Sequence, residues 1–97
     1  MRYVLFTMRD DRISGFKSAS EVVLYNIEEN KPEKSIRNTG IDALEELIEE
    51  YDAWLLFTRE ISGEDKELVE ETGVKVVVTS LETIDEVIGE FFTGEPK

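Results

Sequence analysis

Apolar residues in the first part of the chain gather in short runs between polar segments, as is typical of β-strands. Residues 2–8 are rich in aromatic and β-branched side chains and lead into a polar Arg-Asp-Asp sequence, which predicts a first strand. Residues 21–27 predict a second strand, and a polar turn separates it from a third at 33–38. The third segment has one large apolar residue, Ile36. It therefore suits the edge of a sheet, where charged side chains block unwanted pairing.

Helical spacing replaces this pattern from Ile41 onward. Apolar residues follow Ile41 at intervals of three and four, which predicts an amphipathic helix with Thr39 as its N-cap. Residues 62–72 predict a second helix. Ser62 is its expected cap, and Gly73 lies where a helix ends in a left-handed residue.

A third helix is predicted to follow Thr83. Thr83 and Glu86 have the spacing of a capping box, and the clearest amphipathic pattern in the chain comes directly after them. Phe91 and Phe92 belong to its apolar stripe, so we expect both side chains to lie in the core.

Two further segments, residues 52–58 and 74–79, are almost wholly apolar, as are parallel strands covered on both faces. Strands that alternate with helices pair in parallel through right-handed crossovers. The element order β-β-β-α-β-α-β-α therefore predicts a single α/β domain over residues 1–97, with a mixed five-stranded sheet and helices on its faces. We expect the strand order 3-2-1-4-5, with the second strand antiparallel.

Charge is distributed unevenly along the chain, whose 97 residues carry a formal net charge of −12. Residues 1–40 hold seven basic and six acidic side chains, whereas residues 41–97 hold four and seventeen. So acidic a chain repels nucleic acid. No stretch suits a membrane span or a secretory signal. We therefore expect a cytoplasmic monomer or weak homodimer without nucleic-acid or membrane partners. Abundant Glu and the lack of Gln resemble the composition of thermophile proteins.

The side-chain inventory excludes several chemistries, because the chain has no Cys and no His. Disulfides, thiolate sites and nucleophilic triads that use His are thereby ruled out, and the commonest metal ligands are missing. The glycines stand apart, without the pattern of a phosphate-binding loop. We therefore expect no catalytic residue and no metal ligated by the protein.

Loops that follow parallel strands meet at the carboxyl ends of those strands, where open α/β sheets bind ligands. We select eight candidate binding residues there: Arg12, Ser14, Phe16, Lys17, Ser18, Arg59, Ser62 and Gly63. Ser62 and Gly63 open the second helix, whose free amides and dipole favour an anion. The pattern indicates a small anionic ligand. The alternative is that the cations are solvated and balance Asp10, Asp11 and Glu60.

Most of the chain is similar to one known family. ISGFKSASEVVLYNIEENK, residues 13–31, resembles that family's first loop and second strand, where a Ser-x-His-Phe-Gly-x-Ala pattern leads into an apolar strand. Residues 40–57, 67–79 and 83–95 resemble its later helices and strands. The family is that of dinitrogenase iron–molybdenum cofactor biosynthesis, the NifX-like or NifB C-terminal-like domain. The resemblance implies a ribonuclease H-like fold.

The chain resembles a divergent member of that family. Ser14, Phe16 and Ala19 match the loop pattern, but the loop is one residue shorter, the histidine has no counterpart and Lys17 replaces the glycine. Residues 59–62, Arg-Glu-Ile-Ser, replace a glycine-rich turn. The resemblance implies a non-catalytic accessory protein that carries an iron–molybdenum or iron–sulfur cluster precursor and meets a cofactor-assembly protein.

The lack of metal-ligating side chains restricts how the protein would hold a cluster precursor. Without Cys or His, the chain would bind an anionic cluster through charge and hydrogen bonds. Two other functions stay open: a protein-interaction module that has lost cluster binding, and an enzyme that acts on a small phosphorylated substrate.

Overall fold

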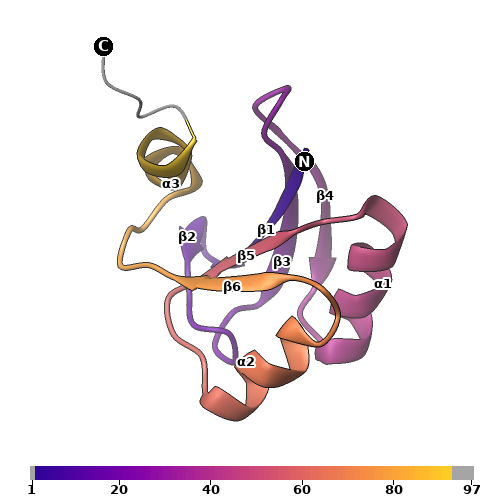
Figure 1. The fold of residues 1–97 in the computed structure, drawn as a ribbon. Helices are drawn as coiled ribbons and strands as arrows, with labels where there is room; N and C mark the ends of the chain where they lie inside the picture. Colours follow the sequence, from indigo (N-terminus) through magenta and orange to yellow (C-terminus); the bar gives the residue numbers. More distant parts are fainter. Residues whose placement is uncertain (1, 93–97) are drawn as a thin grey trace.

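A computed structural model describes residues 2–92 (Figure 1). The strands are β1 (Tyr3–Arg9), β2 (Arg12–Ile13), β3 (Glu21–Asn26), β4 (Lys31–Arg37), β5 (Leu55–Thr58) and β6 (Lys75–Val78). The helices are α1 (Ile41–Tyr51), α2 (Gly63–Glu70) and α3 (Ile84–Phe91). The predicted domain boundaries at 1 and 97 lie outside the described residues. No helix within residues 2–92 has the length and hydropathy needed to cross a membrane.

The sheet confirms the predicted topology of the five longer strands. Their order is β4-β3-β1-β5-β6. Strand β1 pairs antiparallel with β3 and parallel with β5. Strand β4 is antiparallel to β3, and β6 is parallel to β5. Strand β1 is therefore the central strand, and its carboxyl end lies beside that of its parallel neighbour β5.

The predicted number of five strands was one too few. Strand β2 pairs antiparallel with the end of β1, which makes a six-stranded sheet. Asp10 and Asp11 form the turn between them, with φ of 50° and 66°, in the left-handed region that Asp tolerates better than most residues. A strand of two residues is too short to leave a periodic pattern in the sequence.

The two faces of the sheet are covered unequally (Figure 1). Helices α1 and α2 pack on one face, where the core includes Leu5, Leu56 and Val69. Helix α3 covers the other face, where Phe6 and Phe57 pack against it in a second cluster. Side chains of successive strand residues point to opposite faces, which explains how Leu5 and Phe6 enter different clusters.

The helix caps confirm two predictions and correct one. Thr83 and Glu86 form the capping box of α3, and the Ser62 side chain caps α2. The prediction of Thr39 for α1 was wrong, because the N-cap is Gly40 and no side chain caps this helix. Gly40 has a φ of 128°, which glycine adopts without the steric cost of a Cβ.

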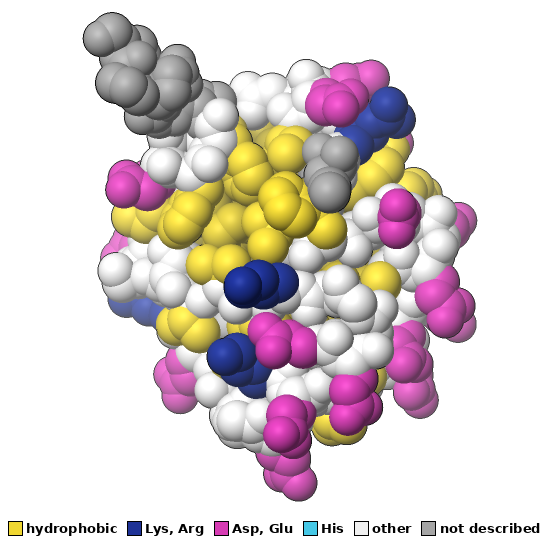
Figure 2. Space-filling model, in the orientation of Figure 1, with side chains coloured by type: hydrophobic (Ala, Val, Ile, Leu, Met, Phe, Trp, Pro, Cys, Tyr) yellow, Lys and Arg dark blue, Asp and Glu magenta, His cyan; other side chains and the backbone are white. Residues whose placement is uncertain are grey.

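The expected burial of Phe91 was also wrong, because its side chain is 48% exposed. Phe92 is half-buried and packs against the second cluster. The Phe91 ring contacts that of Phe57, with the centroids 5.2 Å apart. Since α3 is the one described helix on its face of the sheet, the other side of its apolar stripe is open to solvent. Figure 2 shows the result, a hydrophobic area between α3 and β6.

Candidate functional site

The loop between β2 and β3 is held rigidly at the carboxyl end of the central strands. Phe16 is its anchor, 6% exposed and packed in the core beneath α1 and α2. The Phe16 amide donates a hydrogen bond of 2.7 Å to the carbonyl of Glu60. The Asn38 Nδ2 group donates to the carbonyls of Phe16 and Ala19, at 2.9 and 3.0 Å. The loop is therefore preformed.

The carbonyl oxygen of Ser14 joins this loop to the ends of β1 and β5. It accepts hydrogen bonds from Thr7 Oγ1 at 2.7 Å and Thr58 Oγ1 at 3.1 Å. The backbone amide of Arg59 also donates to it, at 3.1 Å. The two threonine hydroxyls are 2.8 Å apart, and both residues are fully buried. Such a buried, satisfied polar network fixes one loop conformation.

A cavity of about 340 Å³ lies between this loop and the beginning of α2. Its lining residues are Gly15, Phe16, Lys17, Ser18, Glu60, Ile61, Ser62 and Asp65. Four of the eight predicted residues are among them, and Gly63 begins the adjacent helix. Arg12, Ser14 and Arg59 lie outside the lining. The structure thus brings half of the predicted set together around one hollow.

Acidic side chains partly neutralise the cations of this region. Lys17 Nζ is 3.8 Å from Asp65 Oδ2, and Arg12 Nη1 is 3.0 Å from Glu82 Oε1. The Arg59 side chain is exposed and forms no ion pair within residues 2–92. Arg59 is therefore the predicted cation whose charge is free for a ligand.

The amino end of α2 is less open than predicted. The Ser62 hydroxyl accepts a hydrogen bond of 3.1 Å from the Asp65 amide, and Glu64 and Asp65 occupy the first turn. These acids already complement the positive end of the helix dipole and would repel an added anion. The predicted anion position at Ser62 and Gly63 is thus occupied largely by the chain's own groups.

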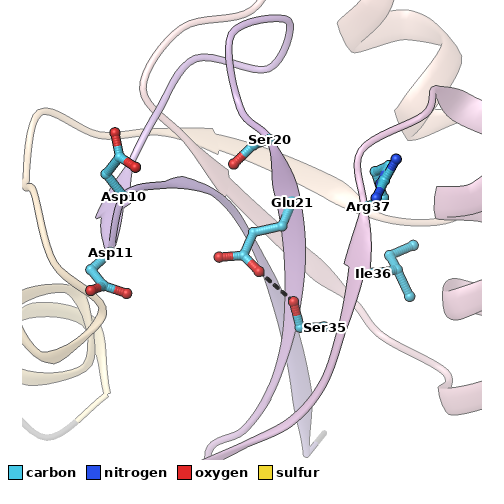
Figure 3. A pocket seen from close by; sticks show the side chains of 7 residues that line it. All are labelled: Asp10, Asp11, Ser20, Glu21, Ser35, Ile36 and Arg37. Atoms are coloured by element: carbon cyan, nitrogen blue, oxygen red, sulfur yellow. Dashed lines mark hydrogen bonds between the residues drawn. The ribbon is translucent and has the colours of Figure 1, made fainter.

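A larger hollow of about 680 Å³ opens beside the β1–β2 turn (Figure 3). Figure 3 shows Asp10 and Asp11 on one side of it, with Glu21 of β3 hydrogen-bonded to Ser35 of β4. Arg37 lies at its opposite border. Carboxylates repel an anionic ligand, and residues 2–92 contain no group of three acids placed to hold a metal ion. We therefore place no site in this hollow.

Sequence reasoning missed the residues that shape the loop from elsewhere in the chain. Thr7 and Thr58 give a weak signal, because each is a polar residue at the end of an apolar strand. Asn38 and Asp65 give none, since an isolated Asn in a loop and an acid in a first helical turn are common for local reasons. Their roles depend on contacts between distant segments.

A family model described as dinitrogenase iron–molybdenum cofactor matches residues 2–94. A search of curated proteins gives no match. A solved structure of a proposed dinitrogenase from Methanocaldococcus jannaschii has a TM-score of 0.71 and 18% identity, with 98% of this chain and 92% of that chain covered.

Two further solved structures are similar to this chain. A proposed NifB protein from Thermotoga has a TM-score of 0.73 and 21% identity, with coverages of 97% and 90%. The apo form of the orange protein from Desulfovibrio gigas has a TM-score of 0.73 and 16% identity, with coverages of 97% and 89%. These likenesses confirm the fold, whereas the family model confirms the predicted family. The chain belongs to the dinitrogenase iron–molybdenum cofactor family.

Proposed function

We propose that the protein is a non-catalytic accessory protein of cofactor biosynthesis, which carries an anionic metal cluster or cofactor precursor for a cofactor-assembly protein. Membership of the family supports the general role. The preformed loop at the carboxyl ends of β1 and β5 supports the location, because this is where open α/β sheets bind ligands. The orange protein was solved as an apo form, which is consistent with a relative that holds a separable group.

The donor set restricts how the cargo is held. The chain has no Cys or His, and the sulfur of Met8 lies in the core with 4% of the residue exposed. The protein therefore offers no thiolate or imidazole to a cluster. A cluster that keeps its own inorganic ligands fits better, because it needs only cations and hydrogen-bond donors from the protein.

The observation that carries this proposal is the position of Arg59. Its backbone amide anchors the carbonyl of Ser14 at 3.1 Å, while its guanidinium is exposed and unpaired among the described residues. The Lys17–Asp65 and Arg12–Glu82 pairs have exposed cations. The Arg12–Glu82 pair is exposed on both sides and stabilises by about 1 kcal/mol or less, whereas the Asp65 side chain is only 14% exposed. Arg12 can therefore leave its present partner at little cost when an anionic ligand binds nearby.

Anaerobic loading tests the proposal. The protein is mixed with an iron–molybdenum cofactor precursor or with tetrathiomolybdate as a defined anionic probe, and metal is measured after gel filtration. We expect metal to elute with the protein, and Arg59→Gln to lower the retained metal about tenfold, since a charge-assisted hydrogen bond to a ligand contributes about 1.5–3 kcal/mol.

Lys31→Gln is the matched control, because Lys31 is an exposed cation paired with Glu29. It lies at the other end of the strands, where β4 pairs with Asn26 and Asn26 pairs with Tyr3. Loss of metal that is equal in both variants, or no retained metal in the parent protein, would rule out a charge-based carrier site at Arg59.

One observation favours the alternative of a protein-interaction module. Glu60 and Asp65 line the loop cavity beside Lys17, so the cavity itself has an acidic balance. A protein that retains no metal but is captured on a defined assembly partner through this loop would support that alternative. The third function, an enzyme on a phosphorylated substrate, is disfavoured by the acids in the first turn of α2.

A further inference from the structure

Strand β6 is an open edge of the sheet and lies nearest the viewer in Figure 1. The Lys75 amide donates to the Trp54 carbonyl at 3.0 Å, and the Thr79 amide donates to the Thr58 carbonyl at 2.9 Å. Successive residues of a strand direct their backbone groups to opposite sides. Val76 and Val78 therefore present their amides and carbonyls to the open edge, as unpaired edge residues do.

One of the two outward-facing amides of β6 is hydrogen-bonded to a side chain. The Val76 amide donates a hydrogen bond of 3.0 Å to Glu70 Oε2. Glu70 is exposed and lies in the last turn of α2, where the helix dipole disfavours an acid. The Val78 amide has no acceptor within residues 2–92, and its residue is 57% exposed. The edge can thus pair with another strand once one flexible carboxylate moves.

The two sides of this edge differ in chemistry. On the α2 side the helix carries four acids and one cation: Glu64, Asp65, Glu67, Glu70 and Lys66. Two exposed apolar side chains, Leu68 and Val78, lie among them, since Val78 shares its face of the sheet with Val76. On the α3 side hydrophobic residues are only partly covered, among them Trp54, Val77 and Leu81, and Phe91 is exposed. Figure 2 shows both from the β6 side, with the hydrophobic area toward α3 and acidic side chains around α2. A groove of about 310 Å³ lies at the beginning of β6, between Glu70 and Lys75.

We propose that the β6 edge binds an extended segment of a partner protein as an added strand. Side chains of such a strand alternate between the two faces of the sheet. The segment that fits has basic side chains toward α2 and apolar side chains toward α3. The backbone groups of Val78 form hydrogen bonds with the segment first. Those of Val76 become available once the Glu70 carboxylate leaves the Val76 amide and forms an ion pair with a basic side chain of the segment.

Charge argues against a second copy of the chain as the occupant. Two copies joined through β6 about a two-fold axis would bring two acidic α2 helices to the same side of the joint sheet. Each chain carries a formal net charge of −12, so this approach is repulsive. A basic segment from another protein is attracted by the same charges.

Amide hydrogen exchange of the labelled protein tests the docking edge directly. The probe is a short peptide that alternates lysine and valine, and its control alternates glutamate and valine. We expect the lysine peptide to slow exchange of the Val78 amide about tenfold or more and to leave α1 unchanged. The glutamate peptide should have no effect at the same concentration.

Matched variants identify the source of the attraction. Glu67→Gln, one turn before Glu70 on α2, should weaken lysine-peptide binding about two- to fivefold, as expected for an exposed ion pair. Glu45→Gln, an exposed acid on α1, should leave binding unchanged. The proposal is overturned if both peptides bind equally, if the lysine peptide gives no protection at Val78, or if Val78 becomes protected with rising protein concentration alone.

Discussion

The loop after β2 and the open edge of β6 both bring backbone polar groups to the surface, but they satisfy them in different ways. In the loop, the side chains of Thr7, Thr58 and Asn38, none of them exposed, bond three of the carbonyls. A fourth carbonyl, that of Ser18, accepts a hydrogen bond from the exposed Arg9. At β6, the exposed Glu70 carboxylate bonds one amide. Buried partners exclude water and hold one conformation, whereas an exposed partner exchanges readily with solvent. The first arrangement suits a preformed ligand site, and the second suits a surface that changes partner.

The largest expected difference between the two regions concerns their apolar side chains. Phe16→Ala removes a ring that is 6% exposed and should lower the free energy of unfolding by about 3–5 kcal/mol. Val78→Ala removes methyl groups from a residue that is 57% exposed and should cost less than about 1 kcal/mol. Urea unfolding followed by circular dichroism measures both. Equal losses would mean that the loop is not anchored more firmly than the edge.

The buried hydroxyl network should show the next largest effect. Thr58→Val keeps the shape of the side chain but removes its bonds to Thr7 and to the Ser14 carbonyl. We expect a loss of about 1–3 kcal/mol of stability, because polar groups are left buried with fewer partners. Exchange of the Phe16 amide, which bonds Glu60, should accelerate at the same time.

Thr39→Val is the control for this substitution, since Thr39 is exposed and should change stability by less than about 0.5 kcal/mol. A Thr58 variant with normal stability and an unchanged Phe16 amide would show that the main-chain bonds alone hold the loop.

Elements with a strong and regular period were predictable from the sequence. The apolar runs of β1, β5 and β6 and the capping box at Thr83 are formed by residues that are close in sequence, so their pattern is visible there. Two features could not be predicted: a very short strand and the N-cap of one helix. Strand β2 has two residues, and Gly40 replaced Thr39 as the cap of α1 because of its backbone conformation.

The position of the cavity beside the candidate residues was predictable, but the ion pairs around it were not. The carboxyl ends of parallel strands follow from topology, which placed Phe16 and Lys17 at the cavity. The pairing of Lys17 with Asp65 and of Arg12 with Glu82 joins segments 48 and 70 residues apart. No local pattern encodes such contacts, and for the same reason the hydrogen bond of Glu70 to β6 could not be expected.

Two substitutions of Glu70 separate its charge from its hydrogen bond and give the smallest change in stability. Glu70→Gln keeps an acceptor for the Val76 amide and removes an acid from the last turn of α2, so we expect stability to rise by about 0.3–1 kcal/mol. Glu70→Ala removes the acceptor as well. The loss of a hydrogen bond, about 0.5–1.5 kcal/mol, then roughly offsets the gain at the helix end, and the net change is close to zero.

Amide exchange distinguishes these variants where stability does not. In Glu70→Ala the Val76 amide should exchange much faster, while the Val77 amide, which faces β5, stays protected. In Glu70→Gln both amides should keep the protection that they have in the parent protein. If Val76 were equally protected in all three proteins, Glu70 would not be the group that closes this edge. The loop would still be held by its buried hydrogen bonds, but an exposed side chain would no longer account for the protection of the β6 edge.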